Sequence, residues 1–289
     1  MNRHRRRIRS GVLTLIGTCT LVFLATTALA GTACTQKPLT PEGLAKASRL
    51  GVKLFSTLDS NNAEVVMIGR VGADLSNYGL RFSHLGFALR NDPKGQWTVI
   101  HLLNRCGTDS SSLYDEGLIT FFLDDPFAYE VIVAVPNPEL QRALVKVLRS
   151  GTVWRLHQAH YNTIAHPQSL DFQNSNQWLL ELVVAAMAKG VVNSRSEVQQ
   201  HPLMQQYQPD VIAIDRLTRL GSGLFKANLT FTDHSLADRL KGEYHIVSVR
   251  SVIRFLHRTG MLERLLWLDL QSAPKTFTGA DLDRVLGRL

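Results

Sequence analysis

The spacing of apolar side chains is helical in two segments of the first half of the chain, and both begin with the same signal. After Thr40-Pro41-Glu42, apolar residues recur every three or four positions from Leu44 to Leu58. A capping hydroxyl followed by a proline in the first turn is typical of a helix start, so an amphipathic helix is predicted to about Leu58. Asn137-Pro138-Glu139 repeats this signal and predicts a second helix to about Arg149.

Four short segments between these helices are rich in β-branched and aromatic residues and are separated by Gly, Asn, Asp or Pro, which is the pattern of strands. They are Val65–Val71, Phe82–Arg90, Trp97–Leu103 and Tyr129–Val135. The sequence therefore predicts that these segments form one sheet.

A third, strongly apolar helix is predicted from about Ser175 to Lys189, closed by Gly190. The pattern beyond it is less regular: a polar helix is predicted around 194–206, an extended piece at 227–232, and an apolar stretch at 246–249 that leads into helical spacing. Because no linker rich in Pro, Gly or Ser separates this part, it is predicted to be a C-terminal extension, from about residue 190, of a single globular domain spanning 31–289.

The first thirty residues have the features of a secretory signal peptide. Five arginines precede an almost uncharged stretch from Val12 to Ala30, and Ala28-Leu29-Ala30 supplies the small residues of a cleavage site. Cleavage after Ala30 is expected, which would place the protein in the periplasm or outside the cell. Two alternatives stay open: an uncleaved anchor, since the stretch is close to the minimum length for spanning a bilayer, and a lipid on Cys34.

Much of the positive net charge of the chain lies in this leader. The net charge of +8 falls to +3 when the five leader arginines are subtracted. A balance that small predicts no polyanion partner such as a nucleic acid, and membrane contact is expected only through an uncleaved or lipidated N-terminus. The hydrophobic content of 45% is spread along the chain and argues against disorder.

Two cysteines are left after cleavage, because Cys19 belongs to the leader. In an oxidising compartment, Cys34 and Cys106 are predicted to form one disulfide. Closing a loop of about 70 residues contributes roughly 4 kcal/mol in the loop-entropy description. The alternative is a buried free Cys106 and an unpaired Cys34.

Two histidines and one helix start are the candidates for chemistry. His84 follows a polar loop punctuated by glycines and begins a predicted strand, a position where functional sites are commonly built. His101 lies on the next predicted strand, and side-chain alternation could let the two histidines face each other. Ser175 begins the apolar helix, where free N–H groups and the helix dipole favour negative charge and therefore a nucleophile.

The other motifs point away from metals and cofactors, and neither is predicted. His157, His160 and His166 form the only histidine cluster, but they lack the spacing and the glutamate of a zinc-protease helix. The patterns of kinases, P-loops, Rossmann folds and Gly-x-Ser-x-Gly hydrolases are absent. Cys106 is a second candidate nucleophile, yet its place just after a strand suits a structural bridge better than a thiol activated at a helix start.

Five longer motifs carry a resemblance to a known family. They are Arg70–Ser76, Ser83–Phe87, His101–Asn104, Tyr114–Leu118 and Asn174–Glu181. From about Cys34 to Gly260 the chain resembles the exported bacterial domain-of-unknown-function family 2145, to which no activity is attached.

More distantly, the chain resembles the circularly permuted papain-like hydrolases of the NlpC-type cell-wall peptidase superfamily, whose histidine strands precede the helix that bears a cysteine nucleophile. The resemblance implies an α+β fold, with a small antiparallel sheet flanked by helices in a papain-like arrangement. It implies His84 as the base, His101 as the residue that orients it and Ser175 as the nucleophile. Serine stands where that superfamily has cysteine, so a degenerate site is also implied.

Two functional hypotheses follow. The first is a hydrolase or acyltransferase that acts on an envelope amide or ester, such as a peptidoglycan stem peptide; the second is a non-catalytic envelope module that binds a partner in the same cleft. The candidate binding residues are Arg70, Asp74, Asn174, Asn176 and Tyr161. Simpler roles are also open: a helix cap formed by Asn174 and Ser175, histidines bonded to backbone carbonyls, and a local Arg70–Asp74 ion pair.

Overall fold

The computed structural model describes residues 38–124, 126–219 and 227–289 of the chain. The expected signal peptide and Cys34 lie outside the described residues, so the signal peptide, its cleavage after Ala30 and the bridge to Cys106 stay predictions. Within the described ranges, no helix has both the length and the apolar character that crossing a bilayer requires.

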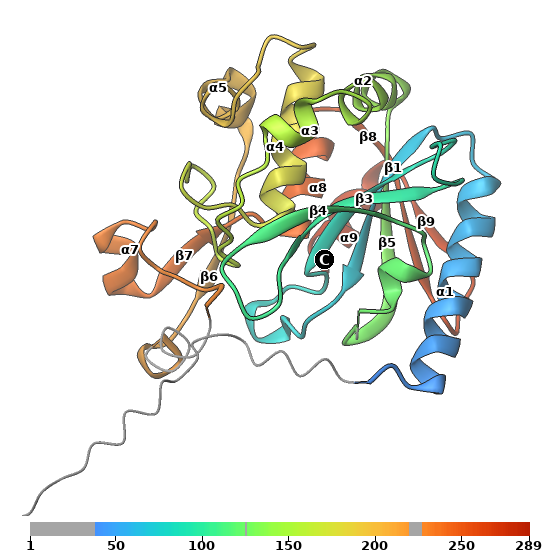
Figure 1. Cartoon of the computed structure of the whole chain (residues 1–289), viewed down its shortest axis with the longest axis horizontal. Coiled ribbons are helices and arrows are strands. Elements are labelled where there is room, and N and C mark those ends of the chain that lie inside the picture. Colours follow the sequence, from blue (N-terminus) through green and yellow to red (C-terminus); the bar gives the residue numbers. More distant parts are fainter. Residues whose placement is uncertain (1–37, 125, 220–226) are drawn as a thin grey trace, which may run out of the picture.

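Among the described residues, seven strands form one antiparallel sheet, and the protein is of the α+β class (Figure 1). In spatial order they are β4 (Ser111–Glu116), β3 (Thr98–Asn104), β2 (His84–Leu89), β1 (Val65–Val71), β5 (Ala128–Pro136), β8 (Leu262–Asp269) and β9 (Lys275–Phe277). Every neighbouring pair is antiparallel. The central strand β1 is buried along its whole length, including the charged Arg70 near its end.

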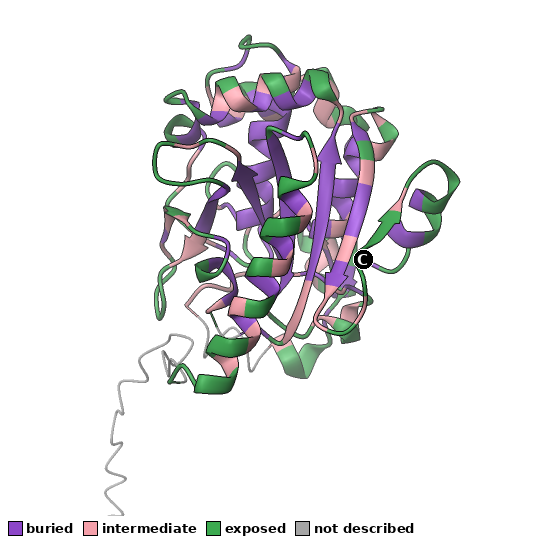
Figure 2. Cartoon of the chain, turned by 90° about the vertical axis from the view of Figure 1, so that its right-hand side faces the viewer, coloured by how far each residue is buried: buried purple, intermediate pink, exposed green. Residues whose placement is uncertain are grey.

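Helices cover both faces of this sheet. Their bounds are α1 (Pro41–Asp59), α2 (Pro138–Leu148), α3 (Thr152–Arg155), α4 (Ser175–Met187), α5 (Arg195–Gln200), α8 (Val249–Arg258) and α9 (Ala280–Leu286), with the 3-10 turn η2 at Thr120–Phe122. Because strand side chains alternate, Val65 and Met67 pack toward α2, α4 and α8, whereas Val66 and Ile68 pack toward α1 and η2. Figure 2, in which α1 faces the viewer, shows the strands buried behind it.

The predicted helix starts are confirmed by their caps. Thr40 Oγ1 accepts a hydrogen bond from the Gly43 N–H at 3.0 Å, and Asn137 Oδ1 accepts one from the Leu140 N–H at 2.9 Å. The apolar helix α4 begins at Ser175, as expected. Side-chain acceptors therefore satisfy N–H groups that have no partner within the helix.

The sheet is larger than the sequence predicts. The four predicted strands correspond to β1, β2, β3 and β5, whereas β4 was missed and the chain beyond residue 190 supplies β8 and β9. The polar helix expected around 194–206 is two elements, α5 and the 3-10 turn η3 (Pro202–Gln206), because a proline cannot donate the next helical hydrogen bond.

A small hairpin stands apart from the main sheet. It consists of β6 (Asp210–Ala213) and β7 (Glu243–Ile246), with the short helix α7 (Leu236–Lys241) leading into β7. The prediction of an extended segment at 227–232 is wrong, since these residues form turns and a loop. The apolar stretch at 246–249 joins the end of β7 to the start of α8.

A buried ion pair holds α5 and the segment before α4 in place. Two guanidinium nitrogens of Arg195 donate to the two oxygens of the Glu181 carboxylate at 2.8 and 2.9 Å, and the side chains are 8% and 0% exposed. Arg195 also donates to three backbone carbonyls in the segment 169–172. The chain that leads into Ser175 is thus anchored to the interior of α4.

Candidate active site

The N-terminus of α4 lies against the start of β2, so Ser175 and His84 are neighbours although 91 positions separate them in the sequence. Asn176 Oδ1 accepts a hydrogen bond from the Leu85 N–H at 3.0 Å, and its amide nitrogen donates to the Ser83 carbonyl at 3.3 Å. Asn176 therefore fixes the first turn of the helix to the first residues of the strand.

Four polar side chains form a continuous chain from this helix start across β2 and β3 to the edge strand β4. Ser175 Oγ lies 2.9 Å from His84 Nδ1, and His84 Nε2 lies 2.8 Å from His101 Nδ1. Glu116 Oε1 lies 3.0 Å from His101 Nε2, at an angle that departs from that of a straight hydrogen bond. The structure thus brings together the three residues that the sequence singled out and adds a carboxylate to them.

Strand register explains how Glu116 reaches His101. Glu116 is the partner of Val99 in the β3–β4 ladder, so its side chain lies diagonally from His101 on the same face of the sheet. On β2, a Cβ at Gly86 would lie 3.2 Å from His101 Cβ and 3.4 Å from the Phe121 ring. The absence of a side chain at Gly86 therefore leaves room for the rings beside it.

The Glu116 carboxylate at the far end of this chain sets the direction of the hydrogen bonds. A proton on His101 Nε2 faces Glu116, whereas a lone pair there would face a negative charge. With that proton in place, His101 Nδ1 accepts from His84 Nε2, and His84 Nδ1 is left as the acceptor for the Ser175 hydroxyl. In this arrangement both histidines are neutral and His84 Nδ1 is positioned to take the serine proton.

Arg70 and Phe121 form the wall beside the two histidines. The ring centroids of His84 and His101 lie 5.8 and 5.3 Å from that of Phe121, and the Arg70 guanidinium lies 4.9 Å from it. Burial lowers the pKa of His84 well below its usual value, and the charge on Arg70 lowers that pKa further. His84 is therefore neutral near pH 7, the protonation state that a general base requires.

The lowered pKa of His84 predicts a loss of folding stability in acid. Below the ordinary value of 6.5 the unfolded chain binds a proton that folded His84 excludes, so its contribution is complete above pH 6.5 and falls as the pH is lowered. The slope for one group is at most about 1.4 kcal/mol per pH unit. Chemical denaturation from about pH 7 to about pH 5 should therefore show a shallower decline for His84→Gln than for the unsubstituted protein.

Other histidines with lowered pKa values, His157 and His166, are present in both proteins and cancel in this comparison. The difference between the two curves then reports His84 alone. Parallel curves over this pH range would contradict the buried, neutral state of His84.

The simpler role suggested for Arg70 and Asp74 is wrong. Arg70 pairs with Asp124 at 2.7 Å and also donates to the Phe121 carbonyl, and its side chain is 4% exposed. Asp74 is exposed and its Oδ1 accepts from the Ser76 N–H at 3.0 Å, which makes a local turn. Arg70 lies on β1 directly opposite His84 on β2. This position in the sheet determines which groups Arg70 contacts.

The simpler roles suggested for Ser175 and the histidines are also corrected. Asn174 alone caps α4, because its Oδ1 accepts from the Gln177 N–H at 2.8 Å. The Ser175 hydroxyl is therefore bonded to His84 rather than to the helix backbone. His84 and His101 have side-chain partners, not the backbone carbonyls that were considered.

Tyr161 lies at the same helix start. Burial raises the pKa of Tyr161, and the hydroxyl and backbone of the neighbouring Ser175 oppose the rise. The backbone of Tyr161 is held by its N–H, which donates to the Asp109 carbonyl at 2.6 Å. The phenol thus occupies the position at the α4 N-terminus where an anion is favoured.

The histidines of the sequence cluster have separate partners. His157 Nε2 lies 3.0 Å from Ser111 Oγ, and His160 Nε2 lies 2.9 Å from Asp109. His166 instead stacks edge-on against another histidine. Across the ranges that the structure describes, no group of three or more His, Cys, Asp or Glu side chains is arranged to hold a metal ion.

Comparison with known proteins relates the chain to one family. The family model described as "uncharacterized protein conserved in bacteria (DUF2145)" matches residues 57–256, which is more than half of the chain. No curated protein and no solved structure matches it. The matched range includes every residue of the Ser175–His84–His101–Glu116 chain.

Proposed function

The chain belongs to the bacterial family DUF2145, and we propose that it is an amide or ester hydrolase with Ser175 as its nucleophile. The observation that carries the proposal is the continuous contact from Ser175 Oγ through His84 and His101 to Glu116, at 2.9, 2.8 and 3.0 Å. A nucleophile bonded to a base, which a third group orients, is the arrangement on which acyl transfer depends.

The proposed reaction gives each member of the chain a defined part. Ser175 Oγ attacks the substrate carbonyl carbon while its proton passes to His84 Nδ1, and the resulting imidazolium is stabilised through His101 by the charge of Glu116. His84 then gives this proton to the leaving amine or alcohol as the carbonyl–leaving group bond breaks. Water, deprotonated by His84, releases the acyl group from Ser175.

The helix start supplies the electrostatic stabilisation. The N–H groups of the first turn of α4 and the Tyr161 hydroxyl lie beside Ser175, where the carbonyl oxygen becomes negative in the transition state. A substrate carbonyl bound beside Ser175 would meet Tyr161. Tyr161 is therefore proposed to contact the substrate.

The order of the parts supports a permuted papain-like arrangement. The two histidine strands, β2 and β3, precede α4 in the chain, and the helix N-terminus rests on the start of β2. Export to the envelope and a peptide amide as substrate, such as a peptidoglycan stem peptide, complete the proposal; they follow from the leader sequence and the resemblance.

Burial favours a second candidate, a non-catalytic binding module. Ser175 is 4% exposed, His84 7% and His101 0%, so a substrate reaches the serine only if neighbouring groups such as Tyr161 move aside. In this alternative the polar chain is a structural network that fixes α4 to the sheet.

Labelling with a fluorophosphonate probe separates the two candidates. The hydrolase is expected to take one label, on Ser175; Ser175→Ala should abolish labelling and His84→Gln should slow it roughly 100- to 10,000-fold. Ser111→Ala is the matched control, since Ser111 Oγ also lies 3.0 Å from a histidine, His157, but not at the start of a long helix. Absence of label from a protein that unfolds normally would favour the module.

A further inference from the structure

A groove separate from the proposed active site lies between α2 and α4 and has a volume of about 700 Å³. Its apolar lining includes Leu140, Ala143, Val147, Met187, Leu203 and Met261. Several of these side chains are only partly buried, so the groove presents unpartnered hydrocarbon surface. The volume falls within the range of about 300–1,000 Å³ of small-molecule sites.

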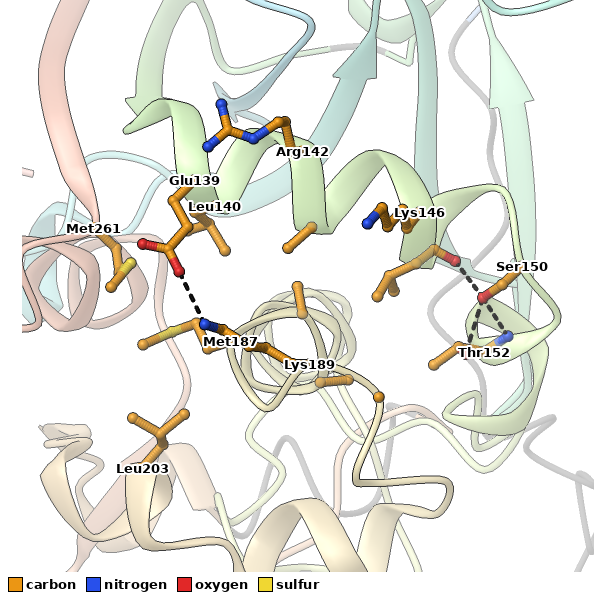
Figure 3. A pocket seen from close by; sticks show the side chains of 15 residues that line it. Glu139, Leu140, Arg142, Lys146, Ser150, Thr152, Met187, Lys189, Leu203 and Met261 are labelled. Atoms are coloured by element: carbon orange, nitrogen blue, oxygen red, sulfur yellow. Dashed lines mark hydrogen bonds and ion pairs between the residues drawn. The ribbon is translucent and has the colours of Figure 1, made fainter.

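Polar side chains stand near both ends of the groove floor that α2 forms (Figure 3). Near the N-terminal end of α2, Glu139 pairs at 3.2 Å with Lys189, which follows α4. Beyond the C-terminal end of α2, Ser150 hydrogen-bonds with Thr152 at the start of α3. The eleven residues of α2 span roughly 16 Å at the helical rise.

Two cations between these ends have no partner of opposite charge among the described residues. Arg142 and Lys146 line the groove, are exposed, and lie four positions apart on the same face of α2. Like charges at this spacing repel each other and destabilise a helix. An anion held between them would remove that repulsion, whereas the Glu139 charge is already balanced by Lys189.

We propose that this groove binds a medium-length fatty acid anion. The alkyl chain lies along the apolar floor between α2 and α4, and the carboxylate lies between Arg142 and Lys146. Hydrocarbon burial supplies the affinity and the paired cations select the negative head group. The lining residues of α4 belong to its last turn, so the site is at the opposite end of that helix from Ser175.

Titration calorimetry of the purified chain with dodecanoate, below its micelle concentration, tests the proposal. Binding of one dodecanoate per chain is expected, with dodecyl maltoside, which has a neutral head on the same alkyl chain, bound at least about tenfold more weakly. The double substitution Arg142→Glu/Lys146→Glu should weaken dodecanoate about tenfold or more. Lys241→Glu, a charge reversal of an exposed lysine on α7, should leave binding within about twofold.

A second variant tests the position of the alkyl chain. Ala143→Trp places an indole in the groove and should abolish dodecanoate binding without changing the head-group cations; thermal unfolding confirms that the variant is folded. The proposal is overturned if dodecanoate does not bind, if it binds no better than dodecyl maltoside, or if neither Ala143→Trp nor the double charge reversal weakens it.

Discussion

Replacing Arg195 with methionine is expected to lower the free energy of unfolding by about 3–5 kcal/mol. The guanidinium is the partner of a carboxylate that is fully buried inside α4, and it also donates to three carbonyls of the segment 169–172. Its loss leaves the Glu181 charge uncompensated, since Gln173 is the remaining donor at 2.7 Å. Burial raises the pKa of Glu181. In the variant, Glu181 is expected to bind a proton, because a buried neutral carboxyl costs less free energy than a buried carboxylate without a partner.

Two comparisons identify the cause of this loss. The double variant Arg195→Met/Glu181→Met should recover much of the stability, because removing both charges removes the desolvation penalty. Lys189→Met is the matched exposed control: its ion pair with Glu139 is 75% and 61% exposed and should contribute at most about 1 kcal/mol. A loss for Arg195→Met no greater than that of Lys189→Met, measured by urea denaturation, would show that the buried pair does not hold the fold.

The elements that were predictable from sequence are those whose signal is local. Thr40 and Asn137 indicate helix starts because their side chains accept hydrogen bonds from N–H groups three residues further along the chain. β1 was predictable because it begins with four consecutive apolar residues, Val65 to Ile68, rich in β-branched side chains. Such signals need no knowledge of what the element packs against.

Elements that depend on a distant partner were missed. β4 reads Ser-Ser-Leu-Tyr-Asp-Glu and lies at the edge of the sheet, where polar side chains meet solvent. Its pairing with β3 decides that it is a strand, and the same pairing decides that Glu116 meets His101. Glu116 was therefore absent from the sequence-based site, although it lies within the motif Tyr114–Leu118, which was the available signal.

The same distinction applies to the candidate site residues. His84 and His101 were placed correctly on adjacent strands because the strands are consecutive and joined by a short connection. Arg70 was assigned to Asp74, four residues away, whereas its actual partner Asp124 is 54 positions distant and is brought near by η2. Sequence proximity is a poor guide to the partner of a residue on a central strand, whose neighbours come from other segments.

A cysteine in place of Ser175 is expected to have a thiol pKa below the ordinary value of about 8.5. The N-terminus of the thirteen-residue helix α4 favours a thiolate. His84 Nδ1, which lies 2.9 Å from Ser175 Oγ, is positioned to accept the thiol proton. Burial opposes the thiolate, but the free N–H groups of the first turn and the Arg70 charge nearby oppose that penalty. A fall of about one pKa unit gives roughly tenfold more thiolate near pH 7.

Thiolate absorbance, titrated with the unsubstituted protein as the reference for the other cysteines, measures this pKa without requiring a reagent to reach the site. Ser111→Cys is the control, because that position also faces a histidine, at 3.0 Å, but lies on β4 and not at a helix start. Adding His84→Gln to Ser175→Cys should return the thiol pKa toward about 8.5. A pKa for Ser175→Cys no lower than that for Ser111→Cys would mean that the α4 N-terminus and its histidine do not activate a nucleophile, and the hydrolase proposal would lose its physical basis.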